Sequence, residues 1–421
     1  MKSKDLFWSI FNWLIILDMF MSLDVWFFWG FNRIAFSAFV SLYCLLFYTA
    51  NQHFFKTTNN KLITSFILLF SAFCLGSDSK NIFGWLGVVL EFLPAFFVIL
   101  LKEEKALQLF NFFKKVLFYI LALSALGWVL HLMGVPLPHS PITFGQIDGN
   151  AQYTYDNYYL FLDNLYDKTK VILPRFSSIF TEPGFLGCIL SVILFSERFQ
   201  FVQRKQNFVF LFSLILTFSL AGWVISILGL IYLRMKPSVK NAFTIIFVIV
   251  AFISLSNFSR VYKNGDNMLY RSIFERLEYD DSSGTITGYN RTRTYVIEYF
   301  NNQFVNSNKF WFGLGEKQFA VDLTGSVDWR AYLIRYGFIS GLFVIFYYLW
   351  PFLSTKKDRY YLFGTSFIFL MIALQTTYGI FSCMYISLFA FSIKNVKYIS
   401  FIENQKANES ISRYLESRGR R

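Results

Sequence analysis

Long apolar blocks constrain the fold of this chain more than any other feature. Blocks of about 15 to 25 mostly apolar residues follow one another along almost the whole sequence, and a helix needs about 20 residues to cross the hydrocarbon core of a membrane. Of the 421 residues, 55% are hydrophobic and only 15% are charged. The sequence therefore predicts an all-α polytopic membrane protein, and it excludes a soluble enzyme, a secreted disulfide scaffold and a disordered chain.

The lengths of these blocks predict about twelve transmembrane helices. They cover residues 7–29, 31–50, 62–76, 82–101, 116–134, 178–196, 207–219, 221–234, 241–256, 329–350, 360–375 and 379–394. The seventh and eighth blocks are short and meet around Ser219, Ala221 and Gly222. We therefore expect these two to be tilted or re-entrant, and the count to lie between about ten and thirteen.

The same blocks divide the chain into six segments. Helices one to five occupy residues 1–134, a first large loop covers 135–177, and helices six to nine follow at 178–256. A second large loop covers 257–328, the last three helices cover 329–394, and a polar tail covers 395–421. We expect this tail to have no catalytic part, because it lies far from both large loops in this arrangement.

Basic residues in alternate short loops set the expected orientation. Examples are Lys102 with Lys105 and Lys356 with Lys357. Because cytoplasmic loops are enriched in Lys and Arg, both termini are predicted to be cytoplasmic and both large loops to lie on the outer face. This bias explains much of the net charge of +13 without nucleic acid as a partner.

The second large loop is rich in arginine, which outer loops usually lack. Its arginines include Arg260, Arg271, Arg276, Arg291 and Arg293. Guanidinium groups bind phosphate oxygens through paired hydrogen bonds, so this concentration predicts an anionic ligand. The alternative is that each arginine simply pairs with an acidic residue of the same loop.

The sharpest local pattern is PRFSSIFTEPGFLG at residues 174–187. Proline is tolerated in the first turn of a helix, so Glu182-Pro183 marks the expected start of the sixth helix, with Thr181 as its N-cap. The free amides of that turn, with Arg175, would form a phosphate site beside Glu182. The alternative is that Glu182 only complements the helix dipole and Arg175 extends to lipid headgroups.

A second cluster covers GYNRTRTYVIEYFNNQFVNSNKFWFGLG at residues 288–315. Helical spacing puts Arg291, Tyr295, Glu298 and Asn302 on one face. The remaining apolar positions, which are Val296, Tyr299, Phe300 and Phe304, are expected to rest on the bilayer surface. The closing Gly-Leu-Gly permits a tight turn back toward the membrane. An interfacial helix with solvated charges is the competing interpretation.

A few ionisable or polar residues lie inside the apolar blocks, where they are costly and hence functional suspects. They are Asp18, Asp24, Glu91, Arg335 and Gln375, and Glu91 is the hardest to explain as an interfacial residue. The histidines at 53, 131 and 139 show no metal spacing, and no Walker, zinc or nucleophile-elbow motif is present. We expect neither a metal nor a cofactor.

Four stretches in this chain resemble one family. RFSSIFTEPGFLG resembles the Arg…Phe-x-Glu-Pro-Gly stretch of the bacterial Wzy-type O-antigen and exopolysaccharide polymerases. SLAGWVISILGLIYL is similar to their small-residue helix two spans later, NRTRTYVIEYFNNQFVNSNKFWFGLG to their arginine-bearing loop, and DWRAYLIRYGFISGLF to the helix after it. The stretches occur in the family's order between residues 174 and 345, beside two large outer loops.

The resemblance implies a metal-independent inner-membrane glycosyltransferase of the GT-C kind. Such an enzyme moves a glycan from one undecaprenyl diphosphate carrier to another lipid-linked repeat unit at the periplasmic face, and a chain-length regulator and a flippase are implied as further partners. In this chemistry Arg175, Arg291 and Arg293 would stabilise the departing diphosphate, and Glu182 would act as the base. Arg330 and Tyr295 complete the expected substrate-binding set.

Two alternatives stay open at this stage. The related O-antigen ligases carry a histidine late in the second loop, whereas residues 257–328 contain none and Trp329-Arg330 stands at that place; this favours a polymerase. A flippase or transporter for the same lipid-linked saccharide would show internal repeats or interrupted helices at the bilayer midplane. No repeat is evident, and the polar residues are concentrated outside the apolar blocks.

Overall fold

The structure is a computed structural model. It describes residues 3–55, 60–76, 82–144, 153–164, 174–201, 204–235, 238–280, 285–286, 294–315, 317–319, 323, 328–353, 358–375 and 379–399. The predicted tail beyond 399 and the pair Arg291 and Arg293 lie outside the described residues.

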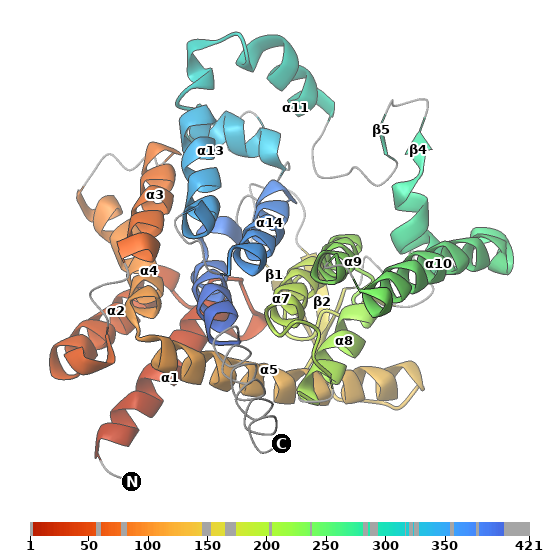
Figure 1. The fold of residues 1–421 in the computed structure, drawn as a ribbon, viewed down its shortest axis with the longest axis horizontal. Coiled ribbons are helices and arrows are strands. Elements are labelled where there is room, and N and C mark those ends of the chain that lie inside the picture. The colour runs from red at the N-terminus through yellow and green to blue at the C-terminus, as the bar shows by residue number, and fades with distance from the viewer. Residues whose placement is uncertain are drawn as a thin grey trace, which may run out of the picture.

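Helices make up most of the described chain (Figure 1). They are α1 (Ser3–Met21), α2 (Arg33–Ala50), α3 (Asn60–Gly76), α4 (Ile82–Leu100), α5 (Glu103–Leu132), α7 (Pro183–Ser196), α8 (Gln206–Leu216), α9 (Leu220–Arg234), α10 (Val239–Val261), α11 (Thr294–Tyr299), α13 (Trp329–Leu353), α14 (Arg359–Gln375) and a last helix at 383–399. The strands are β1 (Ser140–Phe144), β2 (Tyr153–Asn157), β3 (Leu162–Asn164), β4 (Tyr279–Asp280) and β5 (Thr285–Ile286).

Membrane-spanning character is evident in the length and apolarity of the helices. Four helical segments are long and apolar enough to cross a membrane: Arg33–Ala50, Glu103–Leu132, Asn241–Gly265 and Trp329–Leu353. Six shorter apolar helices accompany them. Among these, α8 has only 11 residues, or about 16 Å at 1.5 Å per residue, which fits the short seventh block. The chain is therefore a mostly helical membrane protein, and the count of twelve spans stays a prediction.

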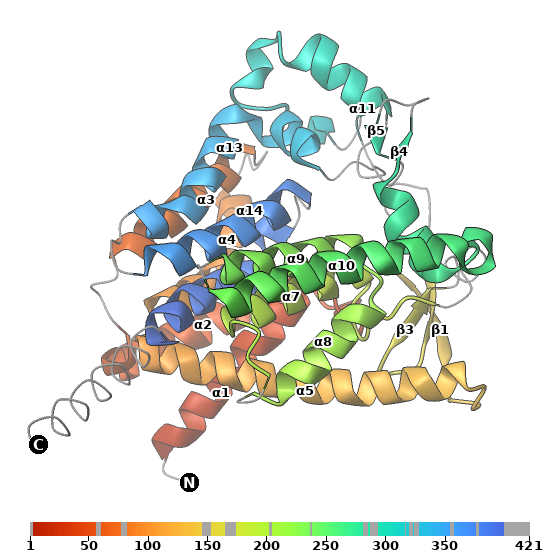
Figure 2. The same ribbon diagram turned by 45° about the vertical axis from the view of Figure 1, so that its right-hand side comes forward.

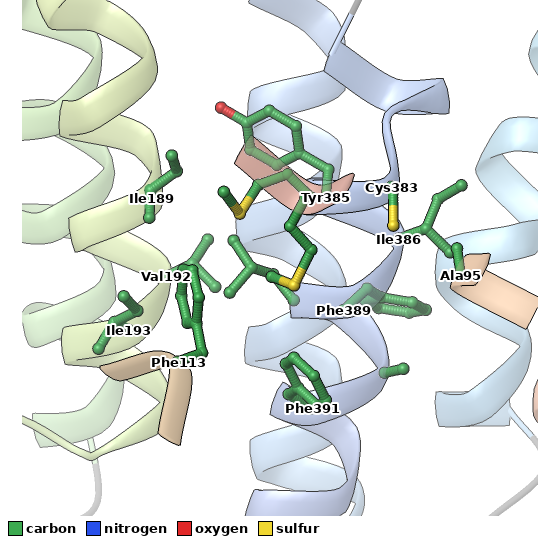
Figure 3. Packing of buried hydrophobic residues seen from close by; sticks show 14 of the residues in the cluster. Ala95, Phe113, Ile189, Val192, Ile193, Cys383, Tyr385, Ile386, Phe389 and Phe391 are labelled. Atoms are coloured by element: carbon green, nitrogen blue, oxygen red, sulfur yellow. The ribbon is translucent and has the colours of Figure 1, made fainter. Parts of the chain in front are cut away.

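The last described helix forms the centre of the molecule. Residues 383–399 are buried on nearly all sides, as expected for a helix that is apolar all round. Figure 3 shows Tyr385 and Phe389 of this helix between Ile189 and Val192 of α7 on one side and Ala95 of α4 on the other. The C-terminal helix thus supplies the core against which earlier helices pack.

Buried charges join several helix ends at one pole of the molecule, which we call the basic end. Glu197, directly after α7, is fully buried and forms ion pairs with Lys114 of α5 and with Arg204 before α8. Lys394 donates hydrogen bonds of 2.8 to 3.1 Å to the carbonyls of Val98, Ile99 and Leu101 at the end of α4. A cation at these free carbonyls satisfies groups that the helix leaves unpaired.

These contacts correct two expected boundaries. Helix α5 begins at Glu103 rather than 116, so Lys114 is a buried helix residue and not a loop cation. The predicted tail begins too early at 395, because the helix continues to 399 and the Asn395 side chain donates a 2.9 Å hydrogen bond to the Ser196 carbonyl. The local sequence did not predict that Lys114 and Asn395 would be buried, because their partners come from distant parts of the chain.

The first block also ends earlier than expected. Helix α1 stops at Met21, although the block was expected to run to 29. The chain turns at Asp24, where φ is +51°, and then forms a single 3₁₀ turn at Trp26–Phe28. A positive φ interrupts a right-handed helix, so residues 22–32 form a connector at the opposite pole from the basic end.

Small residues bring α7 and α9 into backbone contact. A Cβ atom added to Gly222 of α9 would lie 2.9 Å from the Cα atom of Gly187 in α7. Beside this contact, the Ser191 hydroxyl lies within hydrogen-bonding distance of the carbonyls of Gly187 and Gly222, at 2.7 and 2.9 Å. Close approach through Gly and Ser is typical of helix packing in membranes, where no hydrophobic effect drives helices together.

Helix α13 is broken, although one continuous span was expected. Gly337 has a φ of +85° within it. The loop containing Gly313 and Gly315 enters the break: Leu314 N–H donates to the Ile334 carbonyl at 2.8 Å, and Gly315 N–H donates to the Arg335 carbonyl at 3.1 Å. On the other side of the break, Ile339 N–H donates to the Trp311 carbonyl at 3.2 Å. The loop therefore replaces hydrogen bonds that the helix loses.

The first large loop contains an antiparallel sheet in the order β1-β2-β3, an addition to the all-α expectation. Figure 2 shows it beside the last turns of α5. His131 in the last turn of α5 lies 3.5 Å from the buried carboxylate of Asp163 in β3. Ser124 and Ser178 approach at 2.8 Å between their hydroxyl oxygens. The first contact attaches the sheet to α5, and the second attaches α5 to the segment that precedes α7.

We predict that Gly313→Ala lowers the apparent melting temperature of the purified protein in detergent more than Gly134→Ala does. Both glycines have positive φ, at +79° and +81°, so each substitution carries a backbone cost of about 1–2 kcal/mol. Only at Gly313 would the new Cβ also meet backbone, 2.4 Å from the Arg335 carbonyl oxygen; Gly134 has open space. Equal shifts for the two variants would contradict the close docking.

We also predict that Glu197→Gln destabilises the protein by about 3–5 kcal/mol, since it leaves the buried Lys114 ammonium without its counter-charge. The matched control is Glu278→Gln, which breaks a solvent-exposed pair with Arg260 and is expected to have little effect. Thermal unfolding of both variants in the same detergent measures the difference. Comparable losses would show that the pair at the basic end is not buried.

Candidate functional site

The N-terminal end of α7 with the preceding residues 174–182, which we call the mouth of α7, begins as expected, with one correction. Pro183 occupies the first helical position, and the N-cap is Glu182, whose backbone is extended with a φ of −127°. Thr181 is therefore not the cap; it is buried, and its carbonyl accepts a 3.2 Å hydrogen bond from the Tyr155 hydroxyl. The Glu182 side chain is exposed and makes no capping hydrogen bond, so its carboxylate is not used by the amides of the helix.

Backbone hydrogen bonds from three directions hold the segment before α7. Leu162 N–H in β3 donates to the Ser178 carbonyl at 2.9 Å, and Trp26 N–H donates to the Ile179 carbonyl at 3.4 Å. Phe176 N–H donates to the carbonyl at the end of α8 at 3.1 Å. The sheet, the 22–32 connector and α8 thus fix residues 174–182, which explains how a non-helical segment keeps one conformation.

Arg175 lies on this fixed segment and is half-buried. Arg175 thus lies seven residues before Glu182 on the segment that leads into α7. A single cavity facing both residues was expected from their spacing, and that shared cavity stays a prediction.

A cavity of about 430 Å³ lies in the second large loop. Tyr295, Glu298 and Asn302 line it together, as their helical spacing predicted. The sequence analysis missed the other lining residues, which are Tyr299, Gln303, Leu314 and Leu323. Positions 299 and 303 continue the same i, i+3, i+4 pattern, so this signal was present in the sequence.

The opposite face of this helical segment is apolar and buried. Val296, Phe300 and Phe304 pack with Phe319, Leu323, Ala331 and Ile334 in a second hydrophobic cluster. The expectation that these three side chains rest on the bilayer surface is therefore wrong. Packing against the start of α13 removes these apolar side chains from water, as contact with the bilayer would have done. The sequence did not reveal this surface, because it forms only when the loop docks on α13.

Arginines of the second large loop pair with acidic residues of the same loop, as the alternative interpretation predicted. Arg260 pairs with Glu278, and the Tyr270 hydroxyl donates a 2.8 Å hydrogen bond to the same carboxylate. The hydrogen bond from Arg260 is the main cause that lowers the pKa of Glu278, and the one from Tyr270 adds to it. Arg271 lies 3.0 Å from an Asp266 carboxylate oxygen.

Arg330 is the second residue of α13 and contacts the residues on either side of the helix start. Its Nη1 atom lies 3.3 Å from an Asp328 carboxylate oxygen, and its guanidinium lies over the Trp329 ring. The other Asp328 oxygen accepts backbone hydrogen bonds from Arg330 at 3.0 Å and Ala331 at 3.1 Å. Asp328 therefore acts as an N-cap, and Arg330 is oriented by this cap.

Embedded ionisable residues have partners on neighbouring helices. The Glu91 carboxylate of α4 lies 3.7 Å from the Arg33 guanidinium at the start of α2. Asp18 is buried and accepts a 2.8 Å hydrogen bond from the Ser37 hydroxyl. Pairing between helices is the usual way to hold such groups in a membrane, so neither residue requires a catalytic explanation.

Two histidines that looked scattered in the sequence both lie beside the ring of Tyr158. The rings of His131 and His139 lie 4.6 and 5.0 Å from the Tyr158 ring, and Phe161 stacks on Tyr158 at 4.6 Å. Tyr158 therefore packs the loop. Within the described ranges, no three His, Cys, Asp or Glu side chains gather in a metal-binding arrangement.

The four family-like stretches form two pairs in space. The stretch around Glu182 packs through Gly187 against Gly222 of the small-residue helix, and the loop ending in Gly315 docks into the helix broken at Gly337. Comparison of the chain with protein-family models, with curated proteins and with solved structures finds no match.

Proposed function

We propose that this protein polymerises lipid-linked oligosaccharide repeat units at the outer face of a bacterial inner membrane. It would act as a metal-independent glycosyltransferase that moves a glycan from an undecaprenyl diphosphate carrier to the end of a second lipid-linked glycan. The product would be O-antigen or a related surface polysaccharide. Both termini would be cytoplasmic, and both large loops periplasmic.

The observation that carries this proposal is the spatial pairing of the four family-like stretches. A further set of contacts connects the two pairs. Phe381 lies 5.4 Å from Tyr336 of α13 between ring centroids, and Met384 N–H donates a 3.0 Å hydrogen bond to the Ser22 hydroxyl after α1. The connector after Ser22 in turn reaches Ile179 before α7. The mouth of α7 and the start of α13 therefore belong to one pole, opposite the basic end.

The proposed reaction is a displacement at an anomeric carbon. The acceptor hydroxyl oxygen forms the new bond to that carbon while the bond to the diphosphate oxygen breaks, and the bonding electrons leave with the diphosphate. The exposed Glu182 carboxylate would take the hydroxyl proton. Arg175, with Arg291 and Arg293, would neutralise the leaving group through charge-assisted hydrogen bonds.

The packing of the bundle favours group transfer over transport. Transporters also show interrupted helices, but the break in α13 at Gly337 is occupied by residues 311–315 of the same chain. Side chains of 383–399 fill the centre mainly with apolar groups (Figure 3), whereas a transporter needs a polar site near the midplane. Polar residues at the mouth of α7 and around the 430 Å³ cavity lie outside this core.

We predict that deletion of the gene leaves cell-surface lipid capped with a single repeat unit. Without a polymerase, single units still reach the surface lipid, whereas loss of a ligase would leave long chains on the carrier. Gel analysis of glycan length on the carrier and on the surface lipid measures both. Long carrier-linked chains in the deletion strain would identify a ligase instead, and unchanged glycans would exclude both activities.

We predict further that Glu182→Gln abolishes polymer formation while the protein stays in the membrane at normal levels. The substitution removes a proton acceptor with little change in shape, and general-base catalysis typically contributes about 10²–10⁴-fold to a rate. Glu275→Gln, in the second large loop, is the control and should polymerise normally. Near-normal activity of Glu182→Gln would leave only a helix-dipole role for this residue.

A further inference from the structure

We propose that the 430 Å³ cavity of the second large loop binds an uncharged or amino sugar ring, and that it excludes acidic sugars. This inference deepens the proposed function, on which it rests, by naming the class of sugar that the second large loop holds. Its basis is the arrangement and charge of the described residues that line the cavity.

One wall of the cavity is a single helical face. Residues 295, 298, 299, 302 and 303 line it, and their i, i+3, i+4, i+7, i+8 spacing keeps them on one side of α11 and the π-helical turn that follows at Phe300–Phe304. Leu314 and Leu323 also line the cavity. The wall is therefore polar and aromatic, whereas these two leucines are apolar.

The lining groups match the chemistry of a sugar ring. Asn302 and Gln303 each provide an amide that both donates and accepts hydrogen bonds, as sugar hydroxyls do. Tyr295 and Tyr299 provide flat apolar rings with a polar end, suited to the C–H face of a pyranose. A volume of about 430 Å³ also lies within the range of roughly 300–1,000 Å³ typical of small-molecule sites.

Charge decides which sugars fit. Glu298 is the carboxylate of the lining, and no Arg or Lys belongs to the described lining residues. A second anion brought beside Glu298 would be repelled, whereas a hydroxyl or an ammonium group would be attracted. Arg330, the described arginine at the start of α13, is oriented by Asp328 instead. The carboxylate of Glu298 therefore makes the cavity suited to neutral and amino sugars rather than to acidic ones.

The cavity is supported from behind. Leu314 N–H donates a 2.8 Å hydrogen bond to the Ile334 carbonyl at the break in α13. Val296 and Phe300 on the back of the wall are buried together with Ala331 and Ile334. A site whose walls are already packed loses less conformational entropy on binding, which suits a weakly held sugar.

Saturation-transfer NMR on the purified full-length protein in detergent tests the inference. The probes are methyl glucoside, glucosamine and glucuronic acid, each added alone. We expect saturation transfer to the first two, and a loss of about five- to tenfold in affinity for both in Asn302→Ala, as for one lost hydrogen bond of about 1 kcal/mol. Asn301→Ala is the matched control, since this neighbour is exposed but outside the lining.

A charge reversal gives a second arm. Glu298→Lys is expected to weaken the binding of glucosamine and to allow glucuronic acid to bind, because the charge in the cavity changes sign. The side chain is exposed, so the protein is expected to fold with this substitution. Absence of binding by both neutral and amino probes, equal effects at Asn301 and Asn302, or binding of glucuronic acid to the parent protein would each overturn the inference.

The binding result and the proposed function can fail separately. If the purified protein binds the sugars as expected but the deletion strain makes normal glycans, the cavity is a saccharide site and the polymerase proposal is wrong. If the deletion strain shows single repeat units while no neutral or amino sugar binds, the polymerase proposal stands and this cavity does not hold the sugar.

Discussion

When a helix breaks in a membrane protein, its freed backbone N–H and C=O groups need new hydrogen-bond partners from the protein, because lipid offers none. In this protein the break lies at Gly337 of α13, and residues 311–315 supply the partners through three backbone hydrogen bonds. The positive φ angles of Gly313 and Gly315 shape that loop. Its docking places α11 beside α13 and buries one face of α11, so that the other face lines a cavity.

The two poles of the molecule are held by different forces. At the basic end, buried ion pairs around Glu197 and the ammonium group of Lys394 join helix ends. At the opposite pole, hydrogen bonds from Trp26, Leu162 and Phe176 hold the extended segment before α7. Buried ion pairs tolerate little change once formed, whereas loops held by backbone contacts can carry varied side chains. The second pole is therefore the more suitable place for a site.

Within this pole, the described candidate residues lie on two different parts of the chain. Arg175 and Glu182 lie at the mouth of α7, while Tyr295, Glu298 and Asn302 line the cavity of the second large loop. Arg260 and Arg271, which looked like phosphate ligands in the sequence, instead pair with local acids, since a long loop can satisfy its own charges.

The sequence by itself determined the membrane character, the start of α7 at Pro183 and the shared face of Tyr295, Glu298 and Asn302, because block length, proline geometry and helical period are local properties. Tertiary structure alone decided that residues 383–399 form the core, that Lys114 meets Glu197 and that Gly313 meets Gly337. Nearly every helix here is apolar, so composition does not identify which helices pack together. Those pairings depend on shape, on close approach at glycines and on the need to satisfy buried charges and broken backbone hydrogen bonds.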